Sequence, residues 1–128
     1  TVNQMISNAY FRLQRQVFAA VILSFCLLSV SAAKAAELVM FESEGCDWCE
    51  AWDEDIGVAY DKTSEAKIVP LRRVDLDDDR PADLSHLEGL MYTPTFVVMK
   101  DGLEVGRIIG YPGEDFFWQL LNEIIEKI

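Results

Sequence analysis

Hydrophobic residues after position 36 gather in short runs that predict β-strands. The runs are rich in Val, Leu, Ile and Phe and are bounded by charged or glycine-containing segments, a pattern typical of strands. We expect four strands, at residues 38–41, 69–76, 95–99 and 103–109. The last two are separated by Lys100-Asp101-Gly102, a hairpin signal that predicts antiparallel pairing.

Three other segments predict helices. Residues 46–60 place apolar side chains near a 3.6-residue period, at Cys49, Trp52, Ile56 and Tyr60. Residues 82–88 predict a short helix. A last helix is expected to open at Glu114 and Asp115, because acidic side chains suit the positive end of a helix. Its expected apolar stripe consists of Phe117, Leu120, Leu121, Ile124 and Ile128.

The order of these elements predicts their arrangement. A helix between the first two strands makes those strands parallel, whereas the hairpin makes the last two antiparallel. We therefore expect an α/β fold with a mixed four-stranded sheet flanked by helices. Residues 36–128 contain no repeat or linker, so they are expected to form one domain.

The first 35 residues predict an export signal. Arg12 and Arg15 precede an uncharged apolar run at residues 17–30, and a small-residue A-x-A sequence follows at 33–35. We expect residues 1–35 to be a signal peptide and the mature domain to be periplasmic. The alternative is an uncleaved membrane anchor, because residues 17–33, about 17 residues, reach the lower limit for spanning a bilayer.

Charge narrows the classes of partner. The chain has 22 acidic and 11 basic side chains, a net charge of −11. Since Arg12, Arg15 and Lys34 precede residue 36 and no acidic residue does, residues 36–128 carry −14. Such a surface repels nucleic-acid phosphates and anionic membranes, so we expect no nucleic-acid partner and docking on neutral or basic protein surfaces. The alternative is that the charge serves solubility alone.

Two cysteines remain if Cys26 leaves with the signal, and they form a C-x-x-C pair. A disulfide between Cys46 and Cys49 closes almost no loop, so it stabilises the fold little and its value lies in chemistry. Cys46 falls at the predicted start of a helix, where unpaired N–H groups and the helix dipole favour a thiolate. We therefore expect Cys46 to attack a substrate disulfide and Cys49 to resolve the mixed disulfide.

Other uses of the pair stay open. Structural zinc sites need about four ligands, and the domain adds only His86 to the two cysteines, so no metal site is expected. A hydrolytic dyad of a cysteine with His86 is one alternative. Another is a binding module in which both sulfurs hold copper or a partner as soft ligands. As an exchange enzyme, the protein needs no cofactor beyond its own disulfide.

Over residues 36–128 the sequence resembles the thioredoxin superfamily. The matching segments are the strand, loop, C-D-W-C and helix at 38–60, VDLD at 74–77, YTPT at 92–95, the hairpin at 100–102, and Gly110. The resemblance implies a thioredoxin fold in which Pro94 is a cis-proline beside the disulfide and Thr93 offers backbone groups to an extended substrate strand. The residues expected to surround the substrate are Asp47, Trp48, Tyr92, Thr93, Pro94 and Gly110.

A narrower resemblance concerns C-D-W-C with the following Trp52 and Asp53, RRVDL at 72–76, YTPTFVV at 92–98 and GYPGEDFFWQLL at 110–121. These segments look like the SoxS-type periplasmic thioredoxins of bacterial sulfur oxidation. That implies a reductase that keeps periplasmic protein thiols reduced, including the Sox sulfur-carrier protein, with electrons from a membrane thiol transporter. We expect a monomer. A disulfide isomerase or oxidase on the same fold is the alternative.

Two positions depart from the thioredoxin pattern. Met40 stands where thioredoxins have a buried aspartate that assists proton transfer to the resolving cysteine, so Glu42 or water is expected to take that role. Glu54 stands where thioredoxins have a helix-kinking proline, so the helix at 46–60 is expected to run straight.

Charge beside the cysteines predicts the direction of the redox chemistry. Asp47 adjoins Cys46, and Glu44 and Glu50 lie nearby in the sequence. Negative charge disfavours the Cys46 thiolate. A less stabilised thiolate makes the couple less oxidising, which favours a reductase.

Overall fold

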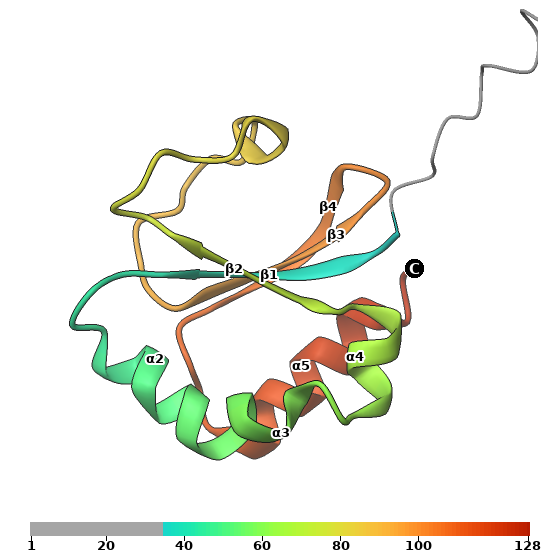
Figure 1. The fold of residues 1–128 in the computed structure, drawn as a ribbon. Helices are drawn as coiled ribbons and strands as arrows, with labels where there is room; N and C mark the ends of the chain where they lie inside the picture. The colour runs from blue at the N-terminus through green and yellow to red at the C-terminus, as the bar shows by residue number, and fades with distance from the viewer. Residues whose placement is uncertain (1–34) are drawn as a thin grey trace, which may run out of the picture. The chain divides into compact units, whose positions relative to one another are not determined.

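Four strands form one mixed sheet in the computed structural model, which describes residues 35–128. The strands are β1 (Glu37–Glu42), β2 (Leu71–Asp75), β3 (Thr95–Lys100) and β4 (Leu103–Ile109), in the order β2-β1-β3-β4 (Figure 1). β1 pairs parallel with β2 and antiparallel with β3, and β3 pairs antiparallel with β4. The predicted fold class and hairpin are confirmed.

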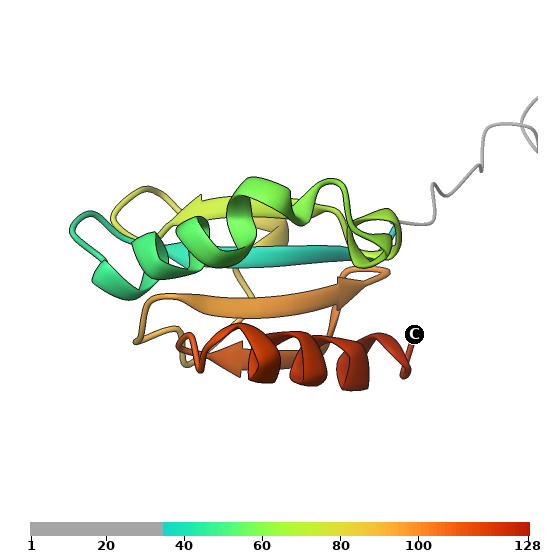
Figure 2. The same cartoon turned by 90° about the horizontal axis from the view of Figure 1, so that it is seen from below.

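The α-helices of residues 35–128 lie on one face of the sheet (Figures 1 and 2). α2 (Asp47–Trp52), a π-helical segment η1 (Asp53–Gly57) and α3 (Val58–Tyr60) follow one another, and α4 (Ser64–Ile68) leads into β2. α5 (Glu114–Ile125) ends the chain on the same side. The opposite face is covered by the segment between β2 and β3, which contains the short 3-10 helix η2 (Ala82–Leu84).

Two apolar clusters, one on each face, explain why the middle four residues of β1 are all hydrophobic. Met40 packs on the helical side with Trp52, Phe96 and Phe117, whereas Phe41 packs on the other side with Leu84 and its neighbours. A strand covered on both faces loses the alternation of polar and apolar residues. β1 is therefore buried along its middle four residues.

The sequence predictions were wrong in several details. α4 was missed, because none of its residues is buried and it shows no apolar stripe; Thr63 begins it by accepting a hydrogen bond from the Ala66 N–H at 3.2 Å. The helix expected at 82–88 shrinks to three residues. Leu120 and Ile128, assigned to the apolar stripe of α5, are exposed, and only Phe117, Leu121 and Ile124 are buried there.

The helix after Cys46 also differs from its prediction. It continues to Tyr60 without a proline, but its middle winds as the π-segment η1 rather than as a regular α-helix. Such segments often occur at functional sites. The interactions of η1 are described with the site below.

The predicted export signal falls on residues 1–34, which lie outside the described part of the chain, and on Ala35. Within residues 35–128 no helix is long and apolar enough to span a bilayer.

Candidate functional site

Cys46 and Cys49 form a disulfide at the start of α2, with their Cα atoms 5.2 Å apart. Cys46 is the N-cap residue, with extended backbone angles (φ −85°, ψ 95°). Its Sγ accepts a hydrogen bond from the Cys49 N–H at 3.1 Å, and its carbonyl oxygen accepts from the Cys49 and Glu50 N–H groups at 3.0 and 3.1 Å. The helix start therefore directs otherwise unpaired donors at Cys46, as the sequence predicted.

The two sulfurs differ in exposure. Cys49 is 5% exposed and belongs to the core cluster of the helical face, whereas Cys46 is only half-buried at the edge of that cluster. Cys46 is consequently the sulfur that an incoming disulfide can reach. This arrangement supports the attacking role for Cys46 and the resolving role for Cys49.

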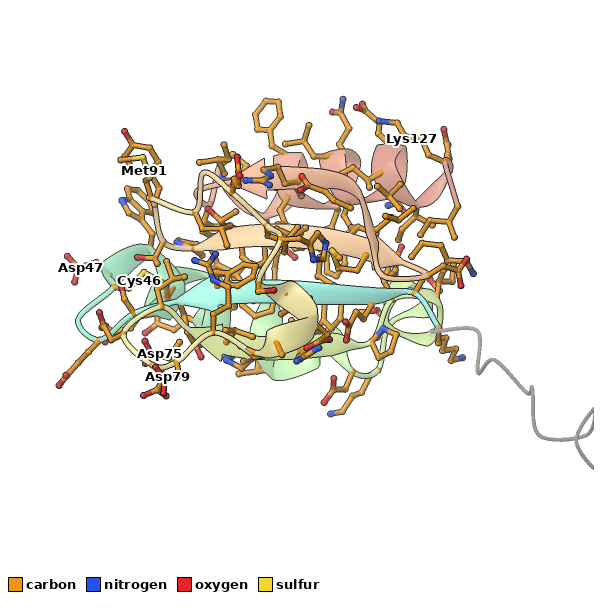
Figure 3. All side chains as sticks on the ribbon, turned by 90° about the horizontal axis from the view of Figure 1, so that it is seen from above. Cys46, Asp47, Asp75, Asp79, Met91 and Lys127 are labelled. Atoms are coloured by element: carbon orange, nitrogen blue, oxygen red, sulfur yellow. A yellow bond between two sulfur atoms is a disulfide. The ribbon has the colours of Figure 1, made fainter. Side chains whose placement is uncertain are left out.

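Large apolar side chains stand exposed at this end of the domain. Trp48 is 63% exposed, Tyr92 67% and Met91 80%. Trp48 therefore does not pack into the core. Figure 3 shows Met91 at the same end of the domain as Cys46 and Asp47. Met91 was missed from the sequence, where the only signal was its position directly before the Tyr92-Thr93-Pro94 motif.

The loop before β3 is hydrogen-bonded to the disulfide loop, the segment that precedes Cys46. The Thr93–Pro94 peptide bond is cis, and Pro94 is buried. The hydroxyls of Thr93 and Ser43 share a 2.9 Å hydrogen bond, which joins this loop to the segment preceding Cys46. The Gly110 N–H donates to the Pro94 carbonyl oxygen at 2.7 Å. The structure thus links Thr93, Pro94 and Gly110 to one another and to the disulfide loop, with Ser43 as a member that sequence reasoning missed.

Acidic side chains surround the same end. Asp47 and Glu50 lie on α2, Asp75 ends β2, and the loop that follows carries three more aspartates at 77–79. The loop after β2 contacts the loop before Cys46, where the Glu44 N–H donates to Asp77 Oδ2 at 3.4 Å. Figure 3 shows Cys46, Asp47, Asp75 and Asp79 at the same end of the domain. The C-terminal ends of the parallel strands β1 and β2 bring these loops together.

The position that departs from the thioredoxin pattern is filled by apolar packing. Met40 is fully buried in the cluster that contains Cys49 and Trp52. Glu42, which the sequence suggested as a proton acceptor, is occupied by Arg73, whose Nε donates to the Glu42 carboxylate at 3.0 and 3.2 Å. The same guanidinium donates to both Asp53 carboxylate oxygens at 2.7 and 2.8 Å.

This Arg73 cluster fastens the disulfide-bearing helix to the sheet. The hydrogen bonds from Arg73 to Asp53 and then to Glu42 raise the pKa of the guanidinium, which therefore stays charged. Since Asp53 opens η1 and Arg73 lies on β2, the cluster joins the two elements next to Met40. A second interaction holds η1 in place: the Tyr111 hydroxyl donates a hydrogen bond to Asp55 Oδ2 at 2.8 Å.

His86, considered as a partner in a hydrolytic dyad, lies elsewhere. The pKa of the Glu104 carboxyl is lowered by hydrogen bonds from Arg107 and, more weakly, by the charge of His86. Glu104 is near the start of β4, at the end of the sheet opposite the disulfide, so the structure does not bring His86 to Cys46. Residues 35–128 contain no group of three or more side chains arranged to hold a metal ion.

Comparison with known proteins agrees with this geometry. The family model for a thioredoxin-like domain matches residues 29–125. The periplasmic thioredoxin SoxS from Paracoccus pantotrophus, solved in its reduced form, is 41% identical, with a TM-score of 0.68 over 72% of this chain and 97% of that one. Fasciola hepatica thioredoxin is 27% identical, with a TM-score of 0.55 over 70% of this chain and 80% of that one. A curated thioredoxin from Chlamydia pneumoniae is 26% identical over 92 residues, 71% of this chain and 84% of that one.

Proposed function

Because the chain belongs to the thioredoxin-like family and carries the Cys46–Cys49 disulfide, its chemistry is thiol-disulfide exchange, and we propose that it acts as a reductase of exported proteins. The observation that supports this proposal most is the unequal exposure of the two sulfurs, with Cys46 at the surface and Cys49 in the core cluster. One exposed and one sheltered sulfur is what two-step exchange requires.

The reaction begins with the reduced pair. The Cys46 thiolate attacks one sulfur of the substrate disulfide, forms a mixed disulfide and expels the other substrate sulfur as a thiolate. The Cys49 thiolate then attacks Cys46 Sγ, closes the Cys46–Cys49 disulfide and releases the second substrate thiolate. In total, two electrons pass from the Cys46–Cys49 dithiol to the substrate. The two substrate thiolates take up two protons, which balance the two protons that the Cys46 and Cys49 thiols lose.

The surroundings of Cys46 favour the reducing direction. The Asp47 carboxylate adjoins the sulfur that must become a thiolate, which disfavours the reduced form and makes the pair a better electron donor. In this scheme Trp48 and Tyr92 contact the substrate, Thr93 offers its backbone groups to an extended substrate segment, and Pro94 and Gly110 hold that loop in place. Asp47 lies at the edge of the same contact area.

The resemblance to SoxS, which is described as a periplasmic thioredoxin, supports a proposal for the location and the partners. We propose a periplasmic location and a substrate protein with a disulfide or a modified cysteine, such as the sulfur-carrier protein of sulfur oxidation. A membrane thiol transporter would return the disulfide to the dithiol. The protein acts in this role as a monomer.

Trapping of mixed disulfides tests the proposal. Cys49→Ser leaves the attack intact but blocks release, so the reduced variant should accumulate covalent adducts with periplasmic proteins that disappear when reductant is added. Cys46→Ser should form none, and mass spectrometry should find the adducts joined through Cys46. Equal trapping by both variants would contradict the assigned roles, and trapping by neither would favour a binding module.

A further inference from the structure

The surface around the disulfide carries two chemistries that together describe a partner. Resting on the proposed reductase function, we propose that the substrate is a polypeptide segment whose disulfide lies among lysines or arginines, and that it docks on the apolar patch formed by Trp48, Met91 and Tyr92. The apolar patch supplies contact, and the acidic side chains around it select the charge of the segment.

The apolar patch lies at the surface and outside the core. Its three side chains are between 63% and 80% exposed. Trp48 comes from the start of α2, and Met91 and Tyr92 from the loop before β3, which the Ser43–Thr93 hydrogen bond joins to the disulfide loop. Aromatic residues and methionine are enriched at protein interfaces, where they form most of the contact energy.

Seven carboxylates lie in the loop before Cys46, on α2, and at or after the end of β2, and Arg80 lines a pocket together with two of them, Asp75 and Asp78. They are Glu44, Asp47, Glu50, Asp75, Asp77, Asp78 and Asp79. Within residues 35–128 none of the seven makes an ion pair, and six of them are exposed. The basic side chain nearest to them in sequence is Arg80, whose guanidinium donates to the Leu87 carbonyl oxygen at 2.8 Å.

The described lysines lie at the other end of the sheet. Lys62 and Lys67 belong to the connection that enters β2, Lys100 ends β3, and Lys127 follows α5. Figure 3 shows Lys127 opposite Cys46 and Asp79. Acidic side chains such as Asp61 and Glu126 lie beside these lysines and offset their charge, whereas no described lysine accompanies the seven carboxylates. The excess of negative charge therefore lies where a substrate disulfide must approach.

The physical consequence is selection at the encounter step. Unscreened charge of one sign around a site speeds the approach of an oppositely charged partner by about 10 to 1,000-fold and slows a like-charged one. The effect weakens as salt shortens the Debye length, from about 30 Å at 0.01 M to about 3 Å at 1 M. A segment with lysine or arginine near its disulfide is therefore favoured, and an acidic segment is disfavoured.

The experiment compares two peptides that differ only in charge. Each contains the same intramolecular disulfide, flanked by three lysines in one and by three glutamates in the other; uncharged hydroxyethyl disulfide is the reference. The reduced wild-type protein is mixed with each under single-turnover conditions, and the rate constant is read from acid-quenched, alkylated samples by mass spectrometry. At about 0.01 M salt the lysine peptide should react at least about tenfold faster than the glutamate peptide, and the ratio should approach one near 1 M.

A pair of charge variants locates the effect. Asp78→Asn/Asp79→Asn should slow the lysine peptide several-fold at low salt and leave the rate with hydroxyethyl disulfide unchanged. The matched control Asp61→Asn/Glu126→Gln removes the same charge at the lysine end and should change neither rate. Equal rates for the two peptides at low salt, or equal effects of the two double variants, would overturn the inference while leaving the reductase function standing. If the protein reduces none of the three disulfides, both the inference and the proposed reductase function would be overturned.

Discussion

At the scale of single residues, the two side chains between the cysteines differ in chemistry. Asp47 is an exposed carboxylate directly after Cys46 in the sequence, and Trp48 is an aromatic ring that is 63% exposed. Neither side chain contributes to the core. Both can therefore be changed to alter the chemistry with little effect on folding.

Replacing Asp47 with histidine should make the disulfide more oxidising. The change removes a negative charge next to Cys46 and adds a group that can be positive, so the thiolate of the reduced form gains stability. We expect the reduction potential of the wild-type protein to lie nearer to the thioredoxin value of about −270 mV than to the strongly oxidising value of about −120 mV. The potential of the variant should be higher, by about 30 mV for each tenfold change in the equilibrium constant. Equilibration against a glutathione series measures both. Glu126→Gln serves as the control, and an unchanged or lower potential for Asp47→His would contradict the electrostatic explanation.

Residue roles that depend on local spacing could be predicted from the sequence, and those that depend on distant contacts could not. The C-x-x-C spacing was enough to predict which cysteine meets the free N–H groups of the helix. Ser43 was missed because its partner, Thr93, is 50 residues away. Glu42 looked free in the sequence, and its engagement by Arg73 becomes visible only when β1 and β2 are paired.

At the scale of elements, the disulfide-bearing helix is fastened on both sides through η1. Asp53 binds Arg73 of β2, and Asp55 accepts from Tyr111 in the segment that enters α5. The apolar positions at 49, 52, 56 and 60 are spaced by three or four residues, which fits a helix with or without a π-turn. The periodicity therefore predicted the helix correctly and could not predict how its middle is wound.

Gly57→Ala should destabilise the protein, although alanine is normally favoured over glycine inside a helix by about 1 kcal/mol. A Cβ at this position would lie 2.5 Å from Asp53 Oδ1 and 3.0 Å from the buried Trp52 ring. Asp53 cannot move freely because Arg73 holds it, so we expect a net loss of about 1–3 kcal/mol in the free energy of unfolding, measured with urea.

A double-variant cycle separates the two causes of that loss. In an Arg73→Gln background Asp53 is released, so Gly57→Ala should cost less there than in the wild-type protein. Arg73→Gln alone should cost about 1 kcal/mol, in keeping with a partly exposed ion-pair cluster. A stabilising effect of Gly57→Ala in the wild-type background would show that the close approach is relieved at no cost.

At the scale of the whole molecule, the mixed strand directions could be predicted because they follow from the helical connection between the first two strands and from the hairpin signal. Which segments cover the two faces of the sheet could not be predicted. The second face is buried beneath a segment with a single three-residue helix, and the contacts of that segment with β1 and β3 have no sequence period. The exposure of Leu120 likewise depends on which elements α5 happens to face.

Two tyrosines should make the fold sensitive to alkaline pH. The Tyr60 hydroxyl donates to the Val69 carbonyl oxygen at 2.8 Å; burial, with the charges of Glu65 and Asp61, raises its pKa. Burial and the hydrogen bond to Asp55 raise the pKa of Tyr111. Unfolded tyrosines titrate near pH 10, so this stability is fully present below about pH 10 and is lost as the pH rises through the higher folded-state pKa values.

Urea unfolding between about pH 8 and pH 11 checks this expectation. The free energy of unfolding should fall above about pH 10, by up to about 1.4 kcal/mol per pH unit for each tyrosine. Tyr60→Phe and Tyr111→Phe should each make the fall shallower. Tyr92→Phe, which changes an exposed ring, should not, and identical slopes in all four proteins would assign the alkaline sensitivity to other groups.

The direction of β1 has a consequence for how the domain can be tethered. The strand enters at Glu37, beside the lysine end, and runs six residues, about 20 Å, before its chain turns into the disulfide loop. Any attachment made through residue 35 therefore joins the domain at the end remote from Cys46. A domain attached at that end to a membrane, a fusion partner or a bead has Cys46 on the side facing away from the attachment. The length of the sheet then separates the disulfide from the attachment point.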